Sequence, residues 1–279
     1  HDMCLILFSY WSHQKYPRIL AANGDEFYER PTAQASFWEE TPHMLAGKDL
    51  KDGGTWIGIT KTGRMAAITN FRDIRNLKSD APSRGNLVSG FLRSDEDPVE
   101  YIHRIKKVAD KYNGFSLILG DSNGLFYFSN TDGYFYEISP GMHGLSNHLL
   151  DTPWPKVERG KKLLTGLTSN GRNPSPDEVF HILADTFRPA DRYLPDTGIG
   201  LEWERLLSSL FIHSEIYGTR SSTLILVDRD NNVTFIERSY VEGPGEYKTV
   251  NYEFRSHPGL FEGGSLHVRN DMNGKKDEK

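Results

Sequence analysis

The chain has 279 residues, 37% of them hydrophobic and 12% aromatic, which is enough for one large mixed domain with a core. Its net charge of -5, with no basic stripe, excludes nucleic acid as an expected partner. The single cysteine excludes an internal disulfide framework, and no apolar run approaches the roughly 20 residues of a membrane span, so we expect a cytoplasmic protein.

The first predicted strand covers residues 4–8 and begins at the only cysteine of the chain. We interpret His1 and Asp2 as an expression remnant and expect no signal peptide, because the apolar run after Cys4 is short and lacks a cleavage site. If Met3 is the start, its removal exposes Cys4 as the first residue. Cys4 would then carry a thiol beside a free α-amine that titrates at about 7.7–8.0. The competing interpretation is a small buried hydrophobic residue.

A second strand is predicted over residues 18–23, and it runs into the polar sequence Asn23-Gly24-Asp25-Glu26. Polar groups at the end of a strand often line a site, because the sheet holds them in place. These residue types are also strong turn formers, so a plain turn is the competing interpretation.

The following region is predicted as a loop and then a hairpin. Residues 31–52 contain Pro31, Pro42 and Gly47, which interrupt regular structure. Residues 54–60 and 64–70 form two strands around a short glycine-containing turn, and the second strand ends at Asn70.

The middle of the chain alternates helices and strands. Helices are predicted over residues 83–92 and 97–111, the second with Asp97 as its N-cap. A meander follows, with strands over 115–120, 125–129 and 134–138. A short strand over 141–147 ends in Asn147, and a helix over 151–164 comes next. His143 and His148 have no carboxylate partner at metal-binding spacing, so we expect no metal site.

The last third contributes two helices and three strands. The helices are predicted over 175–187 and 201–212, and the strands over 223–227, 233–240 and 248–254. Arg220 precedes the first of these strands, where an arginine is by default solvated or ion-paired. From residue 263 the sequence is polar and is expected to be a flexible tail. Walker, dinucleotide-binding and G-x-S-x-G motifs are absent from the sequence.

The pattern of elements predicts the fold class. Strands outnumber helices, hairpins dominate, and helices come in pairs between blocks of strands. This favours an α+β fold, a four-layer αββα sandwich of two antiparallel sheets flanked by helices, formed by residues 3–262 as one domain.

The run from Ile19 to Pro31 resembles the family named for its Asn-Arg-Asp-Glu motif, which includes the transport and Golgi organisation protein 2 group. Further similar stretches follow in the same order as in that family: residues 53–58 with Trp56, 67–70, 112–115, 144–147 with Ser146, 152–154 and 218–221. One departure is plain, because the arginine of the motif is Gly24 here. The role of that arginine, such as anion contact or holding the loop, is therefore open in this chain.

That family is in turn similar to the N-terminal-nucleophile (Ntn) hydrolases of the bile-salt hydrolase and penicillin V acylase branch. The branch uses an N-terminal cysteine, an aspartate after the second strand, two asparagines at strand ends and an arginine near a late strand. The matching residues here are Cys4, Asp25, Asn70, Asn147 and Arg220. The resemblance implies that they share one pocket, with further motif and pocket residues at Asn23, Gly24, Glu26, Trp56 and Ser146.

The activity implied by this resemblance is hydrolysis of a non-peptide amide or related acyl bond, with no required cofactor. Cys4 would be the nucleophile and its amine the base, while Asp25 would hold the amine. Asn147 and Asn70 would stabilise the oxyanion, and Arg220 would favour the thiolate.

A rival hypothesis is a non-catalytic binding protein on the same fold. The resemblance implies links to haem trafficking and to lipid or acyl-CoA metabolism. Cys4, His143 or a methionine would then contact haem iron, reversibly, because no C-x-x-C-H attachment motif is present. A mere interaction scaffold is disfavoured, because polar residues recur at strand ends.

Overall fold

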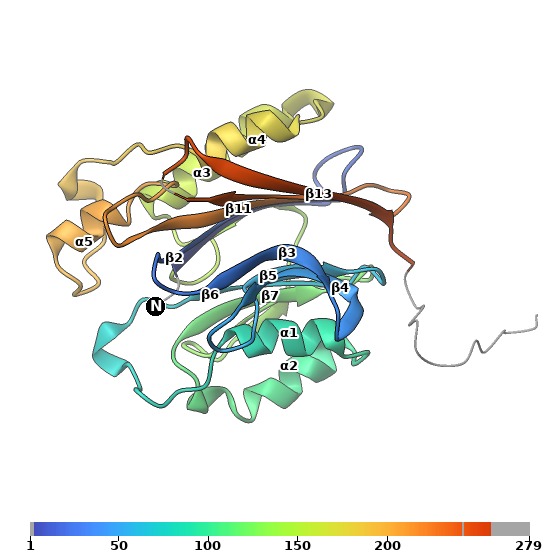
Figure 1. Cartoon of the computed structure of the whole chain (residues 1–279), viewed down its shortest axis with the longest axis horizontal. Helices are drawn as coiled ribbons and strands as arrows, with labels where there is room; N and C mark the ends of the chain where they lie inside the picture. Colours follow the sequence, from blue (N-terminus) through green and yellow to red (C-terminus); the bar gives the residue numbers. More distant parts are fainter. Residues whose placement is uncertain (1–2, 242, 258–279) are drawn as a thin grey trace, which may run out of the picture.

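Two antiparallel sheets stack face to face in the computed structural model, which describes residues 3–241 and 243–257 (Figure 1). Helices α1 (Gly85–Arg93) and α2 (Pro98–Lys106) cover the outer face of one sheet. Helices α3 (Pro155–Thr168) and α4 (Pro176–Leu183) cover the outer face of the other. The predicted αββα sandwich of the α+β class is therefore confirmed.

The six-stranded sheet has the order β10-β1-β2-β11-β12-β13. Its strands are β1 (Met3–Tyr10), β2 (Arg18–Phe27), β10 (Gly141–Leu145), β11 (Tyr217–Val227), β12 (Asn232–Tyr240) and β13 (Tyr247–Arg255). The seven-stranded sheet follows chain order from β3 to β9. Its strands are β3 (Thr32–Trp38), β4 (Thr41–Asp49), β5 (Ile57–Thr60), β6 (Met65–Asn70), β7 (Phe115–Gly120), β8 (Leu125–Ser129) and β9 (Phe135–Glu137).

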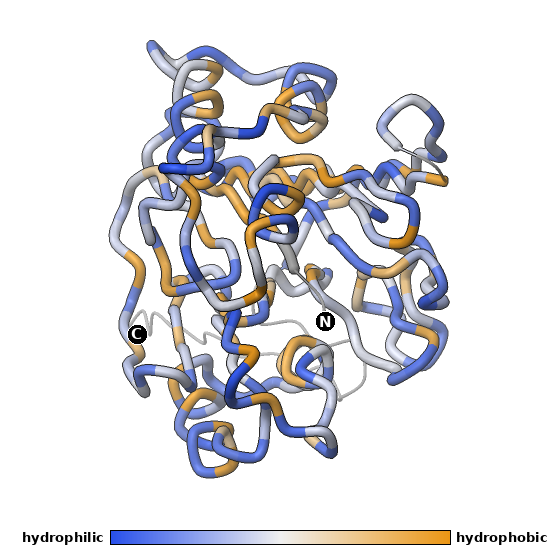
Figure 2. The backbone as a smooth tube through the Cα atoms, turned by 90° about the vertical axis from the view of Figure 1, so that its left-hand side faces the viewer, coloured by the Kyte–Doolittle hydropathy of each residue, from blue (hydrophilic) through white to orange (hydrophobic). Residues whose placement is uncertain are grey.

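Strand β1 shows why the sequence forms these layers. Ile6 and Phe8 pack between the two sheets, whereas Leu5 and Leu7 pack against the helices. Because successive side chains point to opposite faces and both faces are covered, the strand is apolar from Leu5 to Phe8. Figure 2 shows such hydrophobic stretches alternating with hydrophilic connections along the backbone.

The predicted loop over residues 31–52 is wrong, since most of it forms the hairpin of β3 and β4. Pro42 is tolerated because it lies exposed at the second position of β4, before the ladder to β5 begins at Met44. Gly47 is required for space, because a Cβ there would lie 2.7 Å from a ring carbon of Trp56. Pro42 and Gly47 favour turns locally, but strand pairing keeps them extended in β4.

The polar run 23–26 lies inside β2 instead of at the end of a strand, which corrects the prediction. β2 is flanked by β1, which pairs with it as far as Asp25, and by β11, which pairs with it through Glu26. Strand β11 likewise begins at Tyr217, earlier than predicted, and Arg220 falls at an irregularity of register between Thr219 and Ser221.

The predicted helix over 201–212 is only partly present, because α5 (Leu201–Leu206) ends early. After Leu206 the main chain forms hydrogen bonds with other segments instead of continuing the helix. Phe211 N donates to the main-chain oxygen of Asp185 at 2.9 Å, and Ile212 N donates to Thr219 Oγ1 at 2.9 Å. Residues 1–2, interpreted as an expression remnant, and the residues from 263, predicted to be a tail, lie outside the described residues. Within the described part of the chain, every helix is too short or too polar to cross a bilayer.

Candidate active site

The first residues of β1 form the centre of the candidate site. In the ladder between β1 and β2, Cys4 is the partner of Gly24. On the other side, β1 pairs with β10, and Ile6 lies opposite Leu145. The ladder ends at this pair, and Asn147 follows two residues later in a bend. The main chain of Cys4 thus lies beside the polar run of β2.

Asn70 and Asn147 contact each other where β6 and β10 end. Nδ2 of Asn147 donates to the main-chain oxygen of Asn70 at 3.4 Å. Oδ1 of Asn147 accepts from Ser146 Oγ at 3.3 Å and from Arg72 Nη2 at 3.4 Å. Asn147 has a φ of 55°, in the left-handed region that asparagine tolerates better than most residues. Two donors on Oδ1 set the direction of the amide, so its N–H₂ side is turned toward Asn70.

A buried ion pair supports these amides and was not predicted. Arg72 Nη1 donates to Glu204 Oε2 at 2.7 Å, and both side chains are almost fully buried. The other carboxylate oxygen of Glu204 accepts from N and Oγ1 of Thr197, at 2.8 and 2.6 Å. The pair thus connects the end of β6 to α5. The sequence offers only an arginine two positions after a strand, which does not distinguish a buried cation from a solvated one.

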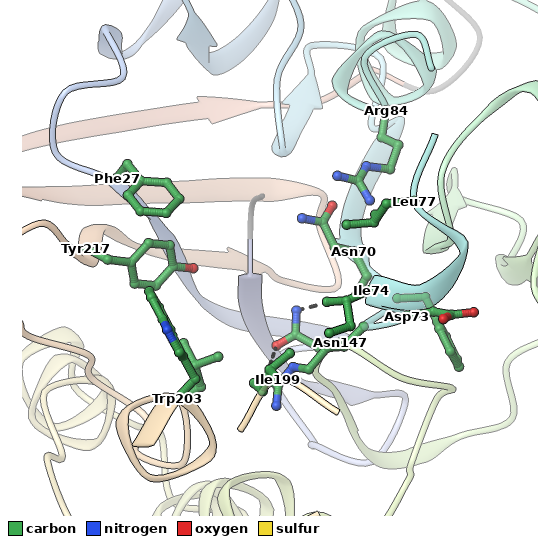
Figure 3. A pocket seen from close by; sticks show the side chains of 13 residues that line it. Phe27, Asn70, Asp73, Ile74, Leu77, Arg84, Asn147, Ile199, Trp203 and Tyr217 are labelled. Atoms are coloured by element: carbon green, nitrogen blue, oxygen red, sulfur yellow. Dashed lines mark hydrogen bonds between the residues drawn. The ribbon is translucent and has the colours of Figure 1, made fainter. Parts of the chain in front are cut away.

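An apolar pocket with a volume of about 290 Å³ opens beside the two asparagines. Figure 3 shows Asn70 and Asn147 on one side of it and Phe27, Tyr217 and Trp203 on the other. Its lining residues are Phe27, Asn70, Phe71, Arg72, Asp73, Ile74, Leu77, Arg84, Asn147, Ile199, Trp203, Leu207 and Tyr217. The volume is at the small end of the range for ligand-binding clefts, and an apolar lining with a few convergent polar groups is typical of them.

Asp25 is a buried carboxyl group on the opposite side of the Cys4 position. Its Oδ1 accepts from Thr219 Oγ1 at 2.6 Å, and its Oδ2 has no hydrogen-bond partner among the described residues. Burial raises the pKa of Asp25 to about 7, against the opposing effects of the buried Lys156 on α3 and of the Thr219 hydrogen bond. A carboxyl group with this pKa exchanges its proton near neutral pH, as acid–base catalysis requires.

Arg220 is bonded to the turn between β2 and β3. Its Nη1 donates to the main-chain oxygens of Phe27 and Arg30, at 2.9 and 3.0 Å, and its Nη2 lies 3.5 Å from Thr32 Oγ1. Burial lowers the pKa of Arg220, and the nearby Tyr28 opposes this effect. The guanidinium therefore holds this turn in place.

A second, polar cavity of about 40 Å³ lies against β2, and we call it the Gly24 pocket. It is lined by Gly24, Asp25, Glu26, Arg30, Thr32, Asp49, Trp56, Arg220 and Ser221. Arg30 Nη2 contacts Asp49 Oδ2 at 2.5 Å, and Arg30 Nε lies 3.6 Å from Glu26 Oε2. Three of the charged residues that line this pocket, Arg30, Asp49 and Glu26, are thus engaged in ion pairs with one another.

Residues 3–242 match the family described as Transport and Golgi organisation 2. This chain belongs to that family. The Transport and Golgi organization protein 2 homolog of Bos taurus is 38% identical over 274 residues, covering 91% of this chain and 99% of that protein. The homolog of Homo sapiens is 37% identical over 273 residues, with 90% and 99% covered. The Drosophila melanogaster protein of the same name is 29% identical over 279 residues, with 90% and 98% covered. The family resemblance is therefore confirmed.

Solved structures with a similar backbone fold include two hydrolases. A mutant of conjugated bile acid hydrolase from Clostridium perfringens has a TM-score of 0.47 at 8% identity, covering 94% of this chain and 100% of that chain. A Caenorhabditis elegans N-acylethanolamine-hydrolyzing acid amidase ortholog has a TM-score of 0.49 at 11% identity, covering 80% and 92%. At these identities the likeness says nothing about the activity of the present chain.

In this member of the Transport and Golgi organisation 2 family, the predicted residues divide between the two pockets. Asn70 and Asn147 line the apolar pocket, and Ser146 contacts Asn147. The members that line the Gly24 pocket are Gly24, Asp25, Glu26, Trp56 and Arg220. Cys4 is the ladder partner of Gly24, which belongs to the second group.

Asn23 lines neither pocket, although its place in the motif predicted a pocket residue. Its Nδ2 donates to the main-chain oxygens of Leu183 and Leu210, both at 2.8 Å, and its Oδ1 accepts from Ser222 Oγ at 2.6 Å. Residues 23 and 24 point to opposite faces of β2, so only Gly24 faces the space between the sheets. Asn23 connects β2 to the helical layer instead.

The two histidines are engaged in local contacts. His143 Nδ1 lies 2.7 Å from Asp151 Oδ2 and its Nε2 lies 2.9 Å from the Ser139 oxygen. His148 Nδ1 lies 2.8 Å from Thr152 Oγ1. Among the residues that the structure describes, no group of three or more His, Cys, Asp or Glu side chains has a metal-binding arrangement.

Proposed function

We propose that this chain is an N-terminal-cysteine amidohydrolase that cleaves a non-peptide amide or related acyl bond. The main support is the position of Cys4 in β1, which has Gly24 as its ladder partner and the Asn70–Asn147 pair at the adjacent strand end. In this proposal a nucleophile, a buried carboxyl group and amide donors from separate segments act together. This is the set of groups that acyl transfer needs.

In the proposed reaction, removal of Met3 first frees the α-amine of Cys4. The amine takes the thiol proton, and the sulfur attacks the substrate carbonyl to form a tetrahedral intermediate. Collapse breaks the carbon–nitrogen bond, the amine of Cys4 delivers the proton to the leaving nitrogen, and a thioester remains. Water then cleaves the thioester, which releases the acid and restores the thiol.

The surrounding groups have distinct roles in this proposal. Asp25 accepts a hydrogen bond from the amine of Cys4, for which its unpartnered Oδ2 is suited. Asn147 donates a hydrogen bond to the oxyanion. To do so it breaks its bond to the main-chain oxygen of Asn70, which at 3.4 Å is long and therefore weak. One such donor typically contributes about 3–4 kcal/mol to the transition state.

The apolar pocket would hold the acyl part of the substrate. Phe27, Tyr217 and Trp203 form its aromatic wall, with Phe27 and Tyr217 edge-to-face at 5.1 Å. Aromatic and aliphatic linings favour hydrocarbon over charged groups. The substrate class is therefore an amide with an apolar acyl chain.

The test compares two forms of the protein. One form starts at Met3, and mass spectrometry confirms that Cys4 is its first residue. The other retains residues 1–3 and so has no free amine on Cys4. We expect the first form alone to release acid from a panel of N-acyl amides and to accumulate a thioester adduct. Cys4→Ala should abolish both signals, whereas Cys4→Ser should keep a slow activity. Turnover that survives in Cys4→Ala would remove the proposal, as would silence of the processed protein across the panel.

The apolar pocket also favours a second candidate, the binding of a lipid-like ligand without cleavage. Leu77 and Arg84 are shared with a groove of about 850 Å³ that also contains Lys51 and Lys78. An apolar chain with an anionic head would match this combination. Haem has less support, because both ring nitrogens of His143 are already in contacts. Titration with a fatty-acid probe and, separately, with haem, on Cys4→Ala protein, distinguishes these cases.

A further inference from the structure

The Gly24 pocket contains buried polar atoms that have no hydrogen-bond partner. Trp56 Nε1 and Ser221 Oγ are both in this state among the described residues, and the Ser221 residue is only 4% exposed. Asp25 Oδ2 is also without a partner among the described residues, but the proposed mechanism assigns it to the amine of Cys4. A buried polar group without a partner destabilises the folded state, because its contact with water is lost and not replaced. Two adjacent ones beside an open cavity therefore indicate a site for a bound polar group.

Gly24 is what keeps this cavity open. A Cβ at position 24 would lie 3.0 Å from Ser221 Oγ and 3.2 Å from Trp56 Nε1. The backbone at Gly24 has no positive φ, so the main-chain conformation does not require a glycine. Glycine in the interior of a strand is otherwise unfavourable. The glycine is thus explained by the space that it leaves in front of Trp56 Nε1 and Ser221 Oγ.

The volume and chemistry of the cavity limit what it can bind. About 40 Å³ accommodates a group of roughly two or three non-hydrogen atoms. Trp56 Nε1 can only donate, so the bound group needs an acceptor, and Ser221 Oγ can donate or accept. Three acids and two arginines line the cavity, a balance that disfavours a carboxylate.

We propose that the Gly24 pocket binds a small neutral oxygen-bearing group, a hydroxyl or a carboxamide, through Trp56 Nε1 and Ser221 Oγ. Gly24 is the ladder partner of Cys4, and the two pockets share no lining residue. If the proposed hydrolase activity holds, on which this extension rests, the group belongs to the amine side of the substrate, while the acyl chain occupies the apolar pocket. Preferred substrates then carry a hydroxyl or carboxamide close to the scissile nitrogen.

The test uses the indole N–H resonance of Trp56 as a direct reporter of the pocket. The full chain with the Cys4→Ala substitution is labelled with ¹⁵N, and Trp56→Phe identifies the Trp56 signal among those of the 5 tryptophans. Formamide, methanol and formate are titrated separately. Formamide and formate have the same size and differ in charge. We expect saturable shifts of the Trp56 signal with formamide and methanol, with dissociation constants on the order of 10 mM, and at least about tenfold weaker binding of formate.

Two variants and one control separate binding from folding. Gly24→Ala should abolish the shift, because the new Cβ fills the cavity, and Ser221→Ala should weaken binding several-fold. Gly166→Ala on α3, where a Cβ meets nothing within 4 Å, should bind like the parent. A Trp56 signal that no probe moves would overturn the proposal, as would tighter binding of formate than of formamide. Since Cys4 is absent throughout, a failure of the hydrolase proposal leaves this result unaffected, and the reverse also holds.

Discussion

Arg72 and Glu204 form a buried ion pair with a 2.7 Å separation between Nη1 and Oε2, 132 positions apart in the chain. Through its Nη2, the same arginine also donates to Asn147. A single cation thus links α5, the end of β6 and the proposed oxyanion donor. Any change to this pair is expected to affect both the stability of the fold and the geometry of the site.

Replacing Glu204 by leucine should leave Arg72 as a buried charge without its carboxylate. We expect a loss of about 3–5 kcal/mol in the free energy of unfolding, measured by urea denaturation. The double variant with Arg72→Leu should recover much of this loss, because two apolar side chains remove the unpaired charge. If Glu204→Leu alone unfolds at the same urea concentration as the parent, the pair does not contribute as inferred.

Substitutions at Asn147 should separate stability from activity. Asn147→Gly keeps the left-handed backbone conformation, whereas Asn147→Ala adds strain of about 1–2 kcal/mol at a φ of 55°. Both remove the amide, so the proposed hydrolysis should slow by about 10²–10³-fold in each. Thermal unfolding and kcat are measured side by side. Equal stability of the two variants would contradict the role of the backbone, and unchanged kcat would contradict the role of the amide.

Asp25 should make stability decrease as the pH rises toward alkaline values. Burial raises its pKa in the folded state to about 7, from 3.8. The folded state therefore holds a proton that the unfolded state has lost, and this stabilisation is complete below pH about 4 and disappears as the pH passes 7. The free energy of unfolding of Asp25→Asn, compared with that of the parent, should be higher at pH 8 than at pH 4. The variant should also be inactive.

Lys156 should influence the titration of Asp25 directly. Its positive charge lowers the pKa of Asp25, against the larger effect of burial. In Lys156→Met the pKa of Asp25 should therefore rise above about 7, as measured by carbon NMR of the labelled carboxyl group. Lys162→Met on the same helix is the control and should leave that pKa unchanged. A fall in the Lys156→Met variant would show that the two groups do not interact as described.

Glu237 is a second buried carboxyl group, and it connects the two sheets. On β12, its Oε1 accepts from the main-chain N of Ala35 on β3 at 2.7 Å. Burial raises its pKa from 4.5 to about 7, while the bonds from Ala35 and Thr223 oppose this rise. Its stabilising effect is thus complete below pH about 4.5 and is lost as the pH rises through 7.

Glu237→Gln should keep the bond to Ala35 and remove this titration. Between pH 5 and 8 its unfolding free energy should change less than that of the parent, with a relative gain of up to about 3 kcal/mol at pH 8. Glu253→Gln, at an exposed position on β13, serves as the matched control and should follow the parent. A Glu237→Gln variant that loses stability equally at both pH values would show that the carboxylate form is not the unfavourable one.

Local patterns in the sequence were sufficient for many elements of the fold. Asp97 is the N-cap of α2, with its side chain accepting from main-chain N–H groups, and Ser175 and Glu178 form the capping box of α4. The hairpin of β5 and β6 also lies where its short glycine-containing turn predicted it. These features depend on neighbours within a few residues, so the sequence carries the information directly.

Other elements depended on partners far away in the chain. The polar run on β2 has turn-forming residues, yet it stays extended because β1 and β11 pair with it on both sides. The Arg72–Glu204 pair and the division of the predicted site residues between two pockets have no local signature either. The sequence by itself determined the layered class and the family. Only the tertiary structure decided which face of a sheet each predicted site residue occupies. Successive side chains of a strand point to opposite faces, and the neighbouring strands set how far the strand extends.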